Sequence, residues 1–157
     1  MAENLVKNQT QDSQKGKFLT FSIEKEAYGV EISHVTEIIN VHPITKVPEL
    51  PEYIKGIINL RGKIIPVMDV RLKFKKPAVE YDDRTCIVVI DFNDISIGLI
   101  VDSVSEVLSI SEENIILPPN VNNNTKNYIK NIGKTENKVV LILDCEELLE
   151  QDDEETD

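Results

Sequence analysis

The stretch that decides the fold is YIKGIINLRGKIIPVMD, residues 53–69, because the chain contains a second version of it. Residues 128–144 read YIKNIGKTENKVVLILD, with the opening Tyr-Ile-Lys and the closing Asp at matching places. Similarity kept in order over such a separation indicates an internal duplication rather than chance agreement between two β-rich segments.

The first version of this stretch has the pattern of a β-hairpin. Runs rich in Ile and Val flank Arg61 and Gly62, which predicts two strands joined by a two-residue turn. Gly62, and Asn137 in the second version, tolerate positive φ, so we expect a turn of this kind in both copies. Pro66 has no amide hydrogen to donate, which predicts a strand at a sheet edge or a bulge at that place.

The duplication extends toward the N-terminus. Residues 18–40 align without gaps on residues 87–109, and both segments open with the alternating apolar pattern of a half-buried strand. One insertion lengthens the second copy between Ser109 and Tyr128. Two copies of about five short strands each predict an all-β chain of two small barrels. Because barrels of this size bury little apolar area alone, we expect one shared hydrophobic core.

The domain boundaries follow from the repeat and from the composition of the ends. We assign residues 17–150 to one domain, with its subdomains at about 17–80 and 81–150. Residues 1–16 are polar and without periodicity, which predicts a flexible arm, and the acidic residues 151–157 are expected to be a disordered tail.

The charge of the chain excludes several classes of partner. The net charge is −11, and residues 146–157 alone hold eight acidic residues and no basic one. An acidic chain repels phosphate backbones and anionic lipid surfaces, so we expect no nucleic acid partner. No apolar run is long enough to insert into a bilayer, and residues 1–16 lack the pattern of a signal peptide, which predicts a cytoplasmic protein.

The residues that usually carry chemistry are few and scattered. His34 and His42 are the two histidines, and no nucleophile motif accompanies them. Cys86 and Cys145 are isolated in apolar contexts, which favours small buried side chains in a reducing compartment over a zinc site. No glycine-rich phosphate loop is present. We therefore expect no enzymatic activity, no cofactor and no metal.

Two segments resemble a known family. The pattern NLRG-x-I-x-P-x-x-D from Asn59 to Asp69, and the segment GLIVDSVSEVL at residues 98–108, are similar to the hallmark segments of CheW proteins, and the similarity runs from about Phe18 to Leu149. The resemblance implies two SH3-like five-stranded barrels around a shared core, with short helical turns and a C-terminal helix. It also implies a non-catalytic scaffold, monomeric when isolated, that couples the cytoplasmic tips of chemoreceptors to the histidine kinase CheA in signalling arrays.

The same resemblance implies two contact surfaces. The receptor tip, a helical hairpin, would lie in the groove between the barrels and contact the positions that match Ile32, Val35, Glu37, Gly56, Arg61 and Val104. The kinase contact lies mainly near the strand ends of the first barrel, where we place it at Ile44, Lys55, Ile65 and Pro66. A second kinase contact, which closes array rings, would involve Val121, near which relatives can carry an aromatic residue.

Several of these residues have a structural interpretation as well. Arg61 has the alternative of an ordinary solvated turn residue, and Val35 that of a core residue. Glu37 has a counterpart, Glu106, in the second copy, which indicates that part of its role is structural. The Asp that closes each version of the duplicated stretch is predicted to be a cap or a turn former.

Two alternatives to the adaptor remain open for the protein as a whole. One is a CheW-like regulatory module of another two-component signalling system. The other is a small barrel protein that binds a ligand, or acts on one, in the groove between its barrels.

Overall fold

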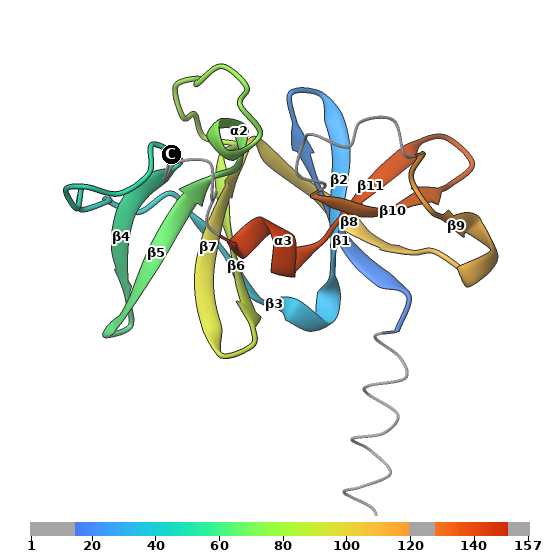
Figure 1. Ribbon diagram of the computed structural model, residues 1–157, viewed down its shortest axis with the longest axis horizontal. Coiled ribbons are helices and arrows are strands. Elements are labelled where there is room, and N and C mark those ends of the chain that lie inside the picture. Colours follow the sequence, from blue (N-terminus) through green and yellow to red (C-terminus); the bar gives the residue numbers. More distant parts are fainter. Residues whose placement is uncertain (1–14, 120–127, 151–157) are drawn as a thin grey trace, which may run out of the picture.

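The computed structural model describes residues 15–119 and 128–150, in which strands dominate and helices are single turns (Figure 1). In chain order the elements are β1 (Lys17–Ile23), β2 (Glu26–Glu31), η1 (Ile32–His34), β3 (Val35–Asn40), β4 (Ile54–Leu60), β5 (Lys63–Asp69), α2 (Val70–Lys73), β6 (Cys86–Phe92), β7 (Ile95–Val101), β8 (Ser103–Ser109), η2 (Glu112–Asn114), β9 (Ile115–Ile116), β10 (Ile129–Lys134), β11 (Val139–Leu143) and α3 (Cys145–Leu149). The all-β class, the short helical turns and the C-terminal helix α3 are confirmed.

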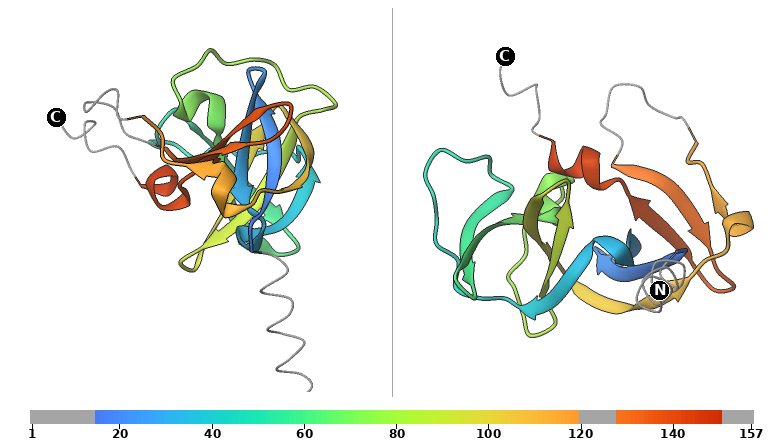
Figure 2. Two further views of the ribbon diagram at one scale, coloured as in Figure 1. Left: turned by 90° about the vertical axis from the view of Figure 1, so that its right-hand side faces the viewer. Right: turned by 90° about the horizontal axis from the view of Figure 1, so that it is seen from below.

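The strands form two sheets. The five-stranded sheet has the order β3-β6-β7-β5-β4, and the six-stranded sheet has the order β8-β1-β2-β11-β10-β9. Glu37 on the edge strand β3 contacts Arg61 beyond the other edge strand, β4, so the five-stranded sheet curls into a barrel, called barrel one below. The six-stranded sheet, barrel two, curls in the same way (Figure 2). Its sixth strand, the two-residue β9, comes from the insertion that lengthens the second copy.

The two copies of the repeat exchange their first hairpins. The hairpin β1–β2 of the first copy lies in barrel two, between β8 and β11. Reciprocally, the hairpin β6–β7 of the second copy lies in barrel one, between β3 and β5. Parallel pairing of β2 with β11, and of β5 with β7, joins the copies at these places. The boundaries 17–80 and 81–150 therefore describe copies along the chain, whereas each barrel contains strands of both.

The turn between β4 and β5 is the predicted two-residue turn. Arg61 has φ +54° and Gly62 has φ +86°, the left-handed pair of a type I′ turn. The corresponding turn between β10 and β11 is longer, and Thr135 and Lys138 close it through a backbone hydrogen bond of 3.0 Å. Asn137 does not have positive φ there, so that prediction was wrong, because a longer loop reverses the chain without left-handed backbone.

Pro66 lies in an internal strand, so the prediction of an edge or a bulge at this residue was also wrong. β5 runs between β7 and β4, and Pro66 is opposite Ile57. The ladder between β5 and β7 begins only at Val67, one residue later. The missing amide hydrogen of Pro66 therefore interrupts no pairing with β7.

The core consists of three clusters. The largest contains residues of both barrels, among them Phe21, Tyr28, Val88 and Leu99, which confirms the shared core. The second cluster fills barrel one with Ile58, Ile65, Val67, Ile87, Val89 and Ile100. The third fills barrel two with Phe18, Ile110, Val140 and Ile142. Cys145 is buried, which raises the pKa of its thiol to about 11, whereas Cys86 is only half-buried.

The two repeated aspartates are helix caps, as predicted. The Asp69 carboxylate accepts a hydrogen bond from the amide of Leu72 in α2. The Asp144 carboxylate accepts from the amides of Glu146 and Glu147 in α3. A side-chain oxygen at this position satisfies helix amides that have no partner within the helix.

A buried lysine links the two copies between these caps. Lys73 is 2% exposed, and its ammonium lies 4.0 Å from the ring centroid of Tyr53 and 5.5 Å from that of Tyr128. The same ammonium donates to the carbonyl of Glu150 at the end of α3. Contact of a cation with two ring faces and a helix-terminal carbonyl offsets the cost of its burial.

Candidate functional site

The candidate site centres on an ion pair between Glu37 on β3 and Arg61 in the β4–β5 turn. The guanidinium donates two hydrogen bonds to the carboxylate, Nη1 to Oε2 at 2.5 Å and Nη2 to Oε1 at 2.9 Å. The Glu37 side chain is 26% exposed and that of Arg61 is 74% exposed. The hydrogen bonds from Arg61 lower the pKa of Glu37, and those to Glu37 raise the pKa of Arg61. The pair presents a preorganised guanidinium to solvent.

Local backbone features position both members of the pair. Arg61 occupies the left-handed first position of its turn, and the Asn59 side chain accepts from the Gly62 amide at 2.8 Å. On β3 the register shifts between Val35 and Glu37, and the hydroxyl of the intervening Thr36 donates to the carbonyl of Val89. A bulge of this kind turns the following side chain toward a new direction.

The second copy repeats the arrangement in weaker form. The register between β1 and β8 shifts at the corresponding place, where Thr20 donates from its hydroxyl to the Glu106 carbonyl. Glu106 then pairs with Lys138 at 3.3 Å, through one donor instead of two. A paired acid at this position is therefore a feature of both copies, which supports the prediction that Glu37 is partly structural. The exposed guanidinium of Arg61 belongs to the first copy alone, because its counterpart is Glu136.

The three apolar residues of the predicted receptor site lie against the shared core. Ile32 in η1, Val35 at the start of β3 and Val104 near the start of β8 are all half-buried and pack on the largest cluster. Val35 is opposite Ile90 and Val104 is opposite Phe21, at equivalent places in the two copies. Each of these side chains thus has one side in the core and the other on the surface.

Gly56 is held in place by close packing. Its φ is +147°, and a Cβ at this position would lie 2.2 Å from the carbonyl oxygen of Thr45 and 2.8 Å from a methyl group of Ile44. The amide of Thr45 bonds to the Ile57 carbonyl beside it, so only glycine lets the segment after β3 approach β4. Gly56 lies near the start of β4 and Arg61 in the turn just after its end, about 17 Å away along the strand. The structure brings Glu37 and Arg61 together and leaves Gly56 at a distance.

The residues predicted to contact the kinase differ in exposure. Ile44, Lys55 and Pro66 are half-buried, and Ile44 packs on the second cluster. Ile65 is 2% exposed and belongs to that cluster, so its side chain supports the surface from within. Val121 lies outside the described residues.

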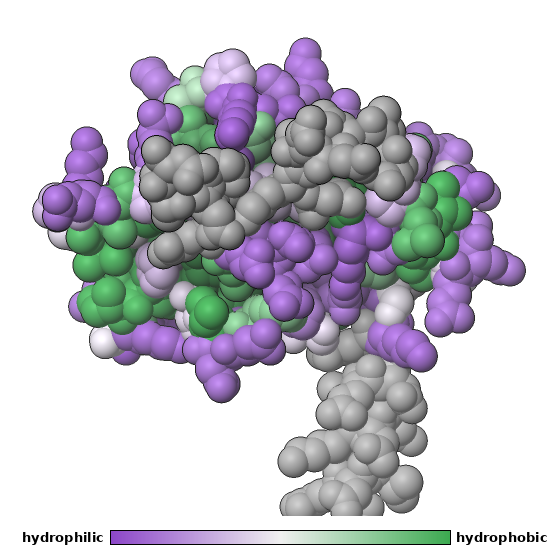
Figure 3. All heavy atoms as spheres, viewed as in Figure 1, coloured by the Kyte–Doolittle hydropathy of each residue, from purple (hydrophilic) through white to green (hydrophobic). Residues whose placement is uncertain are grey.

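Sequence reasoning missed two exposed apolar residues beside the ion pair. Ile38 is 43% exposed and lines a groove of about 500 Å³ together with Asn59 and Arg61. Ile64 is 55% exposed on β5, and Figure 3 shows apolar surface over β4 and β5. For Ile64 the signal in the sequence was available, since apolar residues occupy both the outward and the inward positions of β5 around it.

The part of the chain that the structure describes holds no evident site for a metal or a membrane-spanning helix. In residues 15–119 and 128–150 no three His, Cys, Asp or Glu side chains come together in a way that could hold a metal ion. None of the helices in the same ranges has the length and apolar character needed to cross a bilayer.

A family model described as a CheW-like domain matches residues 17–153. The chain belongs to the CheW-like domain family. The chemotaxis protein CheW of Klebsiella aerogenes is 36% identical over 139 residues, which cover 87% of this chain and 83% of that protein. The chemotaxis protein CheW of Bacillus subtilis is 34% identical over 137 residues, which cover 87% of this chain and 88% of that protein.

A solved structure agrees with the family assignment. The scaffolding protein TtCheW from Thermoanaerobacter tengcongensis superposes with a TM-score of 0.81 at 39% identity, over 87% of this chain and 94% of that one. The resemblance of residues 59–69 and 98–108 to the CheW family is confirmed. CheW scaffolds are not catalytic, and this chain is accordingly a chemotaxis scaffold and not an enzyme.

Proposed function

We propose that this chain couples the cytoplasmic tips of chemoreceptors to the histidine kinase CheA in signalling arrays. Support comes from the family model and from relatives named for chemotaxis, which are similar over most of the chain. The observation that carries the proposal is the Glu37–Arg61 pair, which offers a preorganised, exposed guanidinium next to half-buried apolar side chains.

The receptor contact fits this surface chemically. A helical hairpin presents apolar side chains along one stripe and carboxylates or helix-terminal carbonyls beside it. Ile32, Val35 and Val104 would provide the apolar contacts, because each keeps one side free of the core. Arg61 would bind a receptor carboxylate while Glu37 fixes its direction. Gly56 would act indirectly, by holding the segment that contains Ile44 against β4.

The kinase contact would lie on the apolar surface of barrel one. Ile44, Lys55 and Pro66 are accessible there, whereas Ile65 would act by packing beneath them. The exposed Ile64 extends this surface along β5. In this proposal the isolated chain is a cytoplasmic monomer that arrays recruit through its two partners.

The coupling function is tested by binding to each partner separately. A receptor cytoplasmic fragment and CheA are each immobilised, and retention of the pure chain is measured at tens of micromolar protein. Retention by both partners supports the proposal. If neither partner retains the chain, coupling is not its function.

The site assignment is tested with Arg61→Glu. We expect at least tenfold weaker binding to the receptor fragment, with CheA binding and melting temperature unchanged. Lys138→Glu is the matched control, because it makes the same charge change in the corresponding pair of barrel two. Equal losses for both partners, a lower melting temperature, or the same receptor defect in Lys138→Glu would contradict the assignment.

A further inference from the structure

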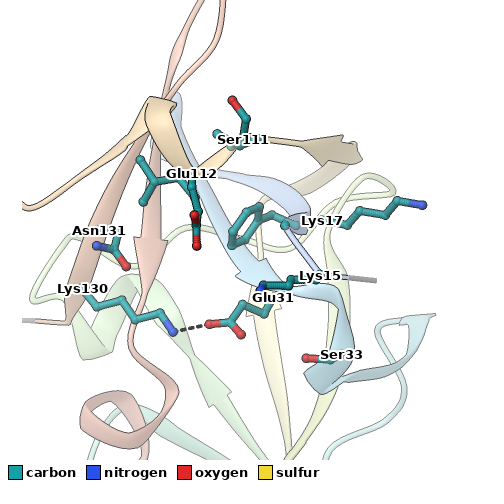
Figure 4. A pocket seen from close by; sticks show the side chains of 12 residues that line it. Lys15, Lys17, Glu31, Ser33, Ser111, Glu112, Lys130 and Asn131 are labelled. Carbon is teal, nitrogen blue, oxygen red and sulfur yellow. Dashed lines mark hydrogen bonds and ion pairs between the residues drawn. The ribbon is translucent and has the colours of Figure 1, made fainter. Parts of the chain in front are cut away.

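Barrel two contains an open cavity of about 760 Å³ (Figure 4). Its floor is apolar and consists of Phe18, Ile110 and Ile115. Polar side chains surround this floor, and Lys130 on β10 points toward Glu31 at the end of β2, with which it forms an ion pair. Four parts of the chain meet here: the start of β1, the end of β2 with η1, the segment of η2 and β9, and β10.

The corresponding place in barrel one is filled. By the alignment of the copies, Phe18 matches Ile87, and Val140 and Ile142 match Ile65 and Val67, so the third core cluster is the counterpart of the second. In barrel one several further side chains cover that cluster, among them those of Tyr81 and Ile44. Ile115 takes the place of Ile44 on the third cluster, whereas Tyr81 has no counterpart there among the described residues.

The two places also differ at the position of Gly56. Thr45 pairs with Ile57 in barrel one, as Ile116 pairs with Ile132 in barrel two. In barrel one the adjacent residue is Gly56, which lets the paired segment approach closely. Its counterpart Asn131 has a side chain, which lines the cavity. The paired segments are hydrogen-bonded in both barrels, so the two places differ in the side chains that occupy them: Tyr81 covers the cluster in barrel one, and Asn131 only lines the cavity in barrel two.

Tyr81 shows what kind of side chain such a place accepts. It lies in the segment before β6, its ring packs on the second cluster, and its hydroxyl donates to the Asp69 carboxylate at 2.8 Å. The corresponding segment in barrel two precedes β1, and the structure describes it only from Lys15. Residues 1–14 contain no aromatic residue, so this chain has no such side chain to offer from that segment.

The charge around the cavity distinguishes it from the rest of the protein. Its lining holds three lysines and two glutamates, a balance of one positive charge, in a chain whose net charge is −11. Because Lys130 and Glu31 neutralise each other, Lys15 and Lys17 face only Glu112. Figure 4 shows the Lys17 side chain directed away from the floor. If an aromatic ring occupied the cavity, Lys17 would be accessible to the residues on either side of that ring. Acidic neighbours of that ring would be repelled less here than elsewhere on the surface.

We propose that this cavity binds one aromatic side chain from an extended, acidic segment of a partner protein, in the place that Tyr81 fills in barrel one. The ring lies on Phe18, Ile110 and Ile115, and the flanking carboxylates lie near Lys15 and Lys17. This surface is distinct from the Glu37–Arg61 site. The outcome of the peptide experiment is therefore independent of whether the chain binds a receptor.

The proposal is tested with two capped peptides, ESGEYEGSE and ESGEAEGSE, titrated into the full isotope-labelled chain. We expect the tyrosine peptide to shift the amide signals of Ser33, Ser111 and Asn131 in a saturable way, with at least tenfold higher affinity than the alanine peptide. Asn131→Tyr should fill the cavity and weaken binding at least tenfold. Asn40→Tyr, the matched change at an exposed position in the groove of barrel one, should leave binding unchanged.

Other outcomes overturn the proposal. If both peptides bind alike, or if the shifts fall elsewhere, the cavity is no aromatic site. If only a variant lacking residues 1–14 binds, the chain's own N-terminal segment is the occupant. Should Asn131→Tyr lose its dispersed spectrum, Ser33→Tyr at the exposed rim replaces it, and unchanged binding in that variant counts against the proposal.

Discussion

Replacement of Gly56 by alanine separates a structural role of this residue from a role in binding. The added Cβ would lie 2.2 Å from the Thr45 carbonyl oxygen and 2.8 Å from a methyl group of Ile44, in a backbone with φ +147°. An incompatible backbone conformation costs an alanine more than about 1 kcal/mol, and overpacking adds about 1–3 kcal/mol. We therefore expect Gly56→Ala to lower the free energy of unfolding by about 3 kcal/mol, which corresponds to about 6–12 °C in melting temperature.

The assay is urea unfolding followed by circular dichroism, with receptor binding measured on the folded fraction. Gly62→Ala is the control, because its φ is also positive, at +86°, whereas no atom lies within 4 Å of the added Cβ. This control should lose only about 1–2 kcal/mol. If Gly56→Ala is as stable as Gly62→Ala and yet fails to bind the receptor fragment, Gly56 is a contact residue and the packing argument is wrong.

Two further predictions follow from the ion pairs and from the hairpin exchange. Burial raises the pKa of Asp102, but hydrogen bonds from Arg71 and from the Glu24 amide lower it below its usual value overall. The stabilisation from a lowered carboxyl pKa is present above the unfolded pKa of about 4 and disappears as the pH falls through the folded pKa. The free energy of unfolding in urea should therefore be higher for wild type than for Asp102→Asn at pH 7, and the difference should disappear at pH 2. Because each barrel takes a hairpin from the other copy, fragments 1–80 and 81–157 should each be unfolded alone by circular dichroism and should form a folded one-to-one complex when mixed. A native-like spectrum from either fragment alone would contradict the exchange.

Features determined by residues close in the sequence were predictable, and those determined by distant contacts were not. The Arg61-Gly62 turn and the two Asp caps depend on a few neighbouring residues, and each is confirmed. The exchange of hairpins was not predictable, because an alignment of two copies gives the order of strands but not the partner of each. The prediction for Pro66 was wrong for the same reason. Pairing of β5 with β7 begins at Val67, and this depends on a strand that is distant in the sequence.

The site itself shows the same division. The pattern around Asn59–Asp69 identified Arg61, and the duplication indicated a structural part for Glu37, but nothing in the sequence indicated that the two residues bind each other. They are 24 positions apart, and the bulge at Thr36 that turns Glu37 toward the turn depends on pairing with a strand of the other copy. The kinase contact at Ile65 stays a prediction: it came from the resemblance, which does not tell which face of β5 is the core, and the Ile65 side chain is 2% exposed.

The duplication makes it possible to separate folding from function within one molecule. Both copies place a bulge and a paired glutamate on the third strand of the repeat, so this arrangement serves the barrel. If the pair served the barrel alone, the one-donor contact of Lys138 would be sufficient in both copies. Barrel one instead uses a guanidinium that donates twice and is 74% exposed, whereas its left-handed backbone belongs to the turn, as at Glu24-Lys25 and Asn93-Asp94. The second donor and the exposure of Arg61 support the proposal that a partner binds this guanidinium. This reasoning predicts that Arg61→Ala and Lys138→Ala lower the free energy of unfolding by similar amounts, whereas only Arg61→Ala weakens receptor binding.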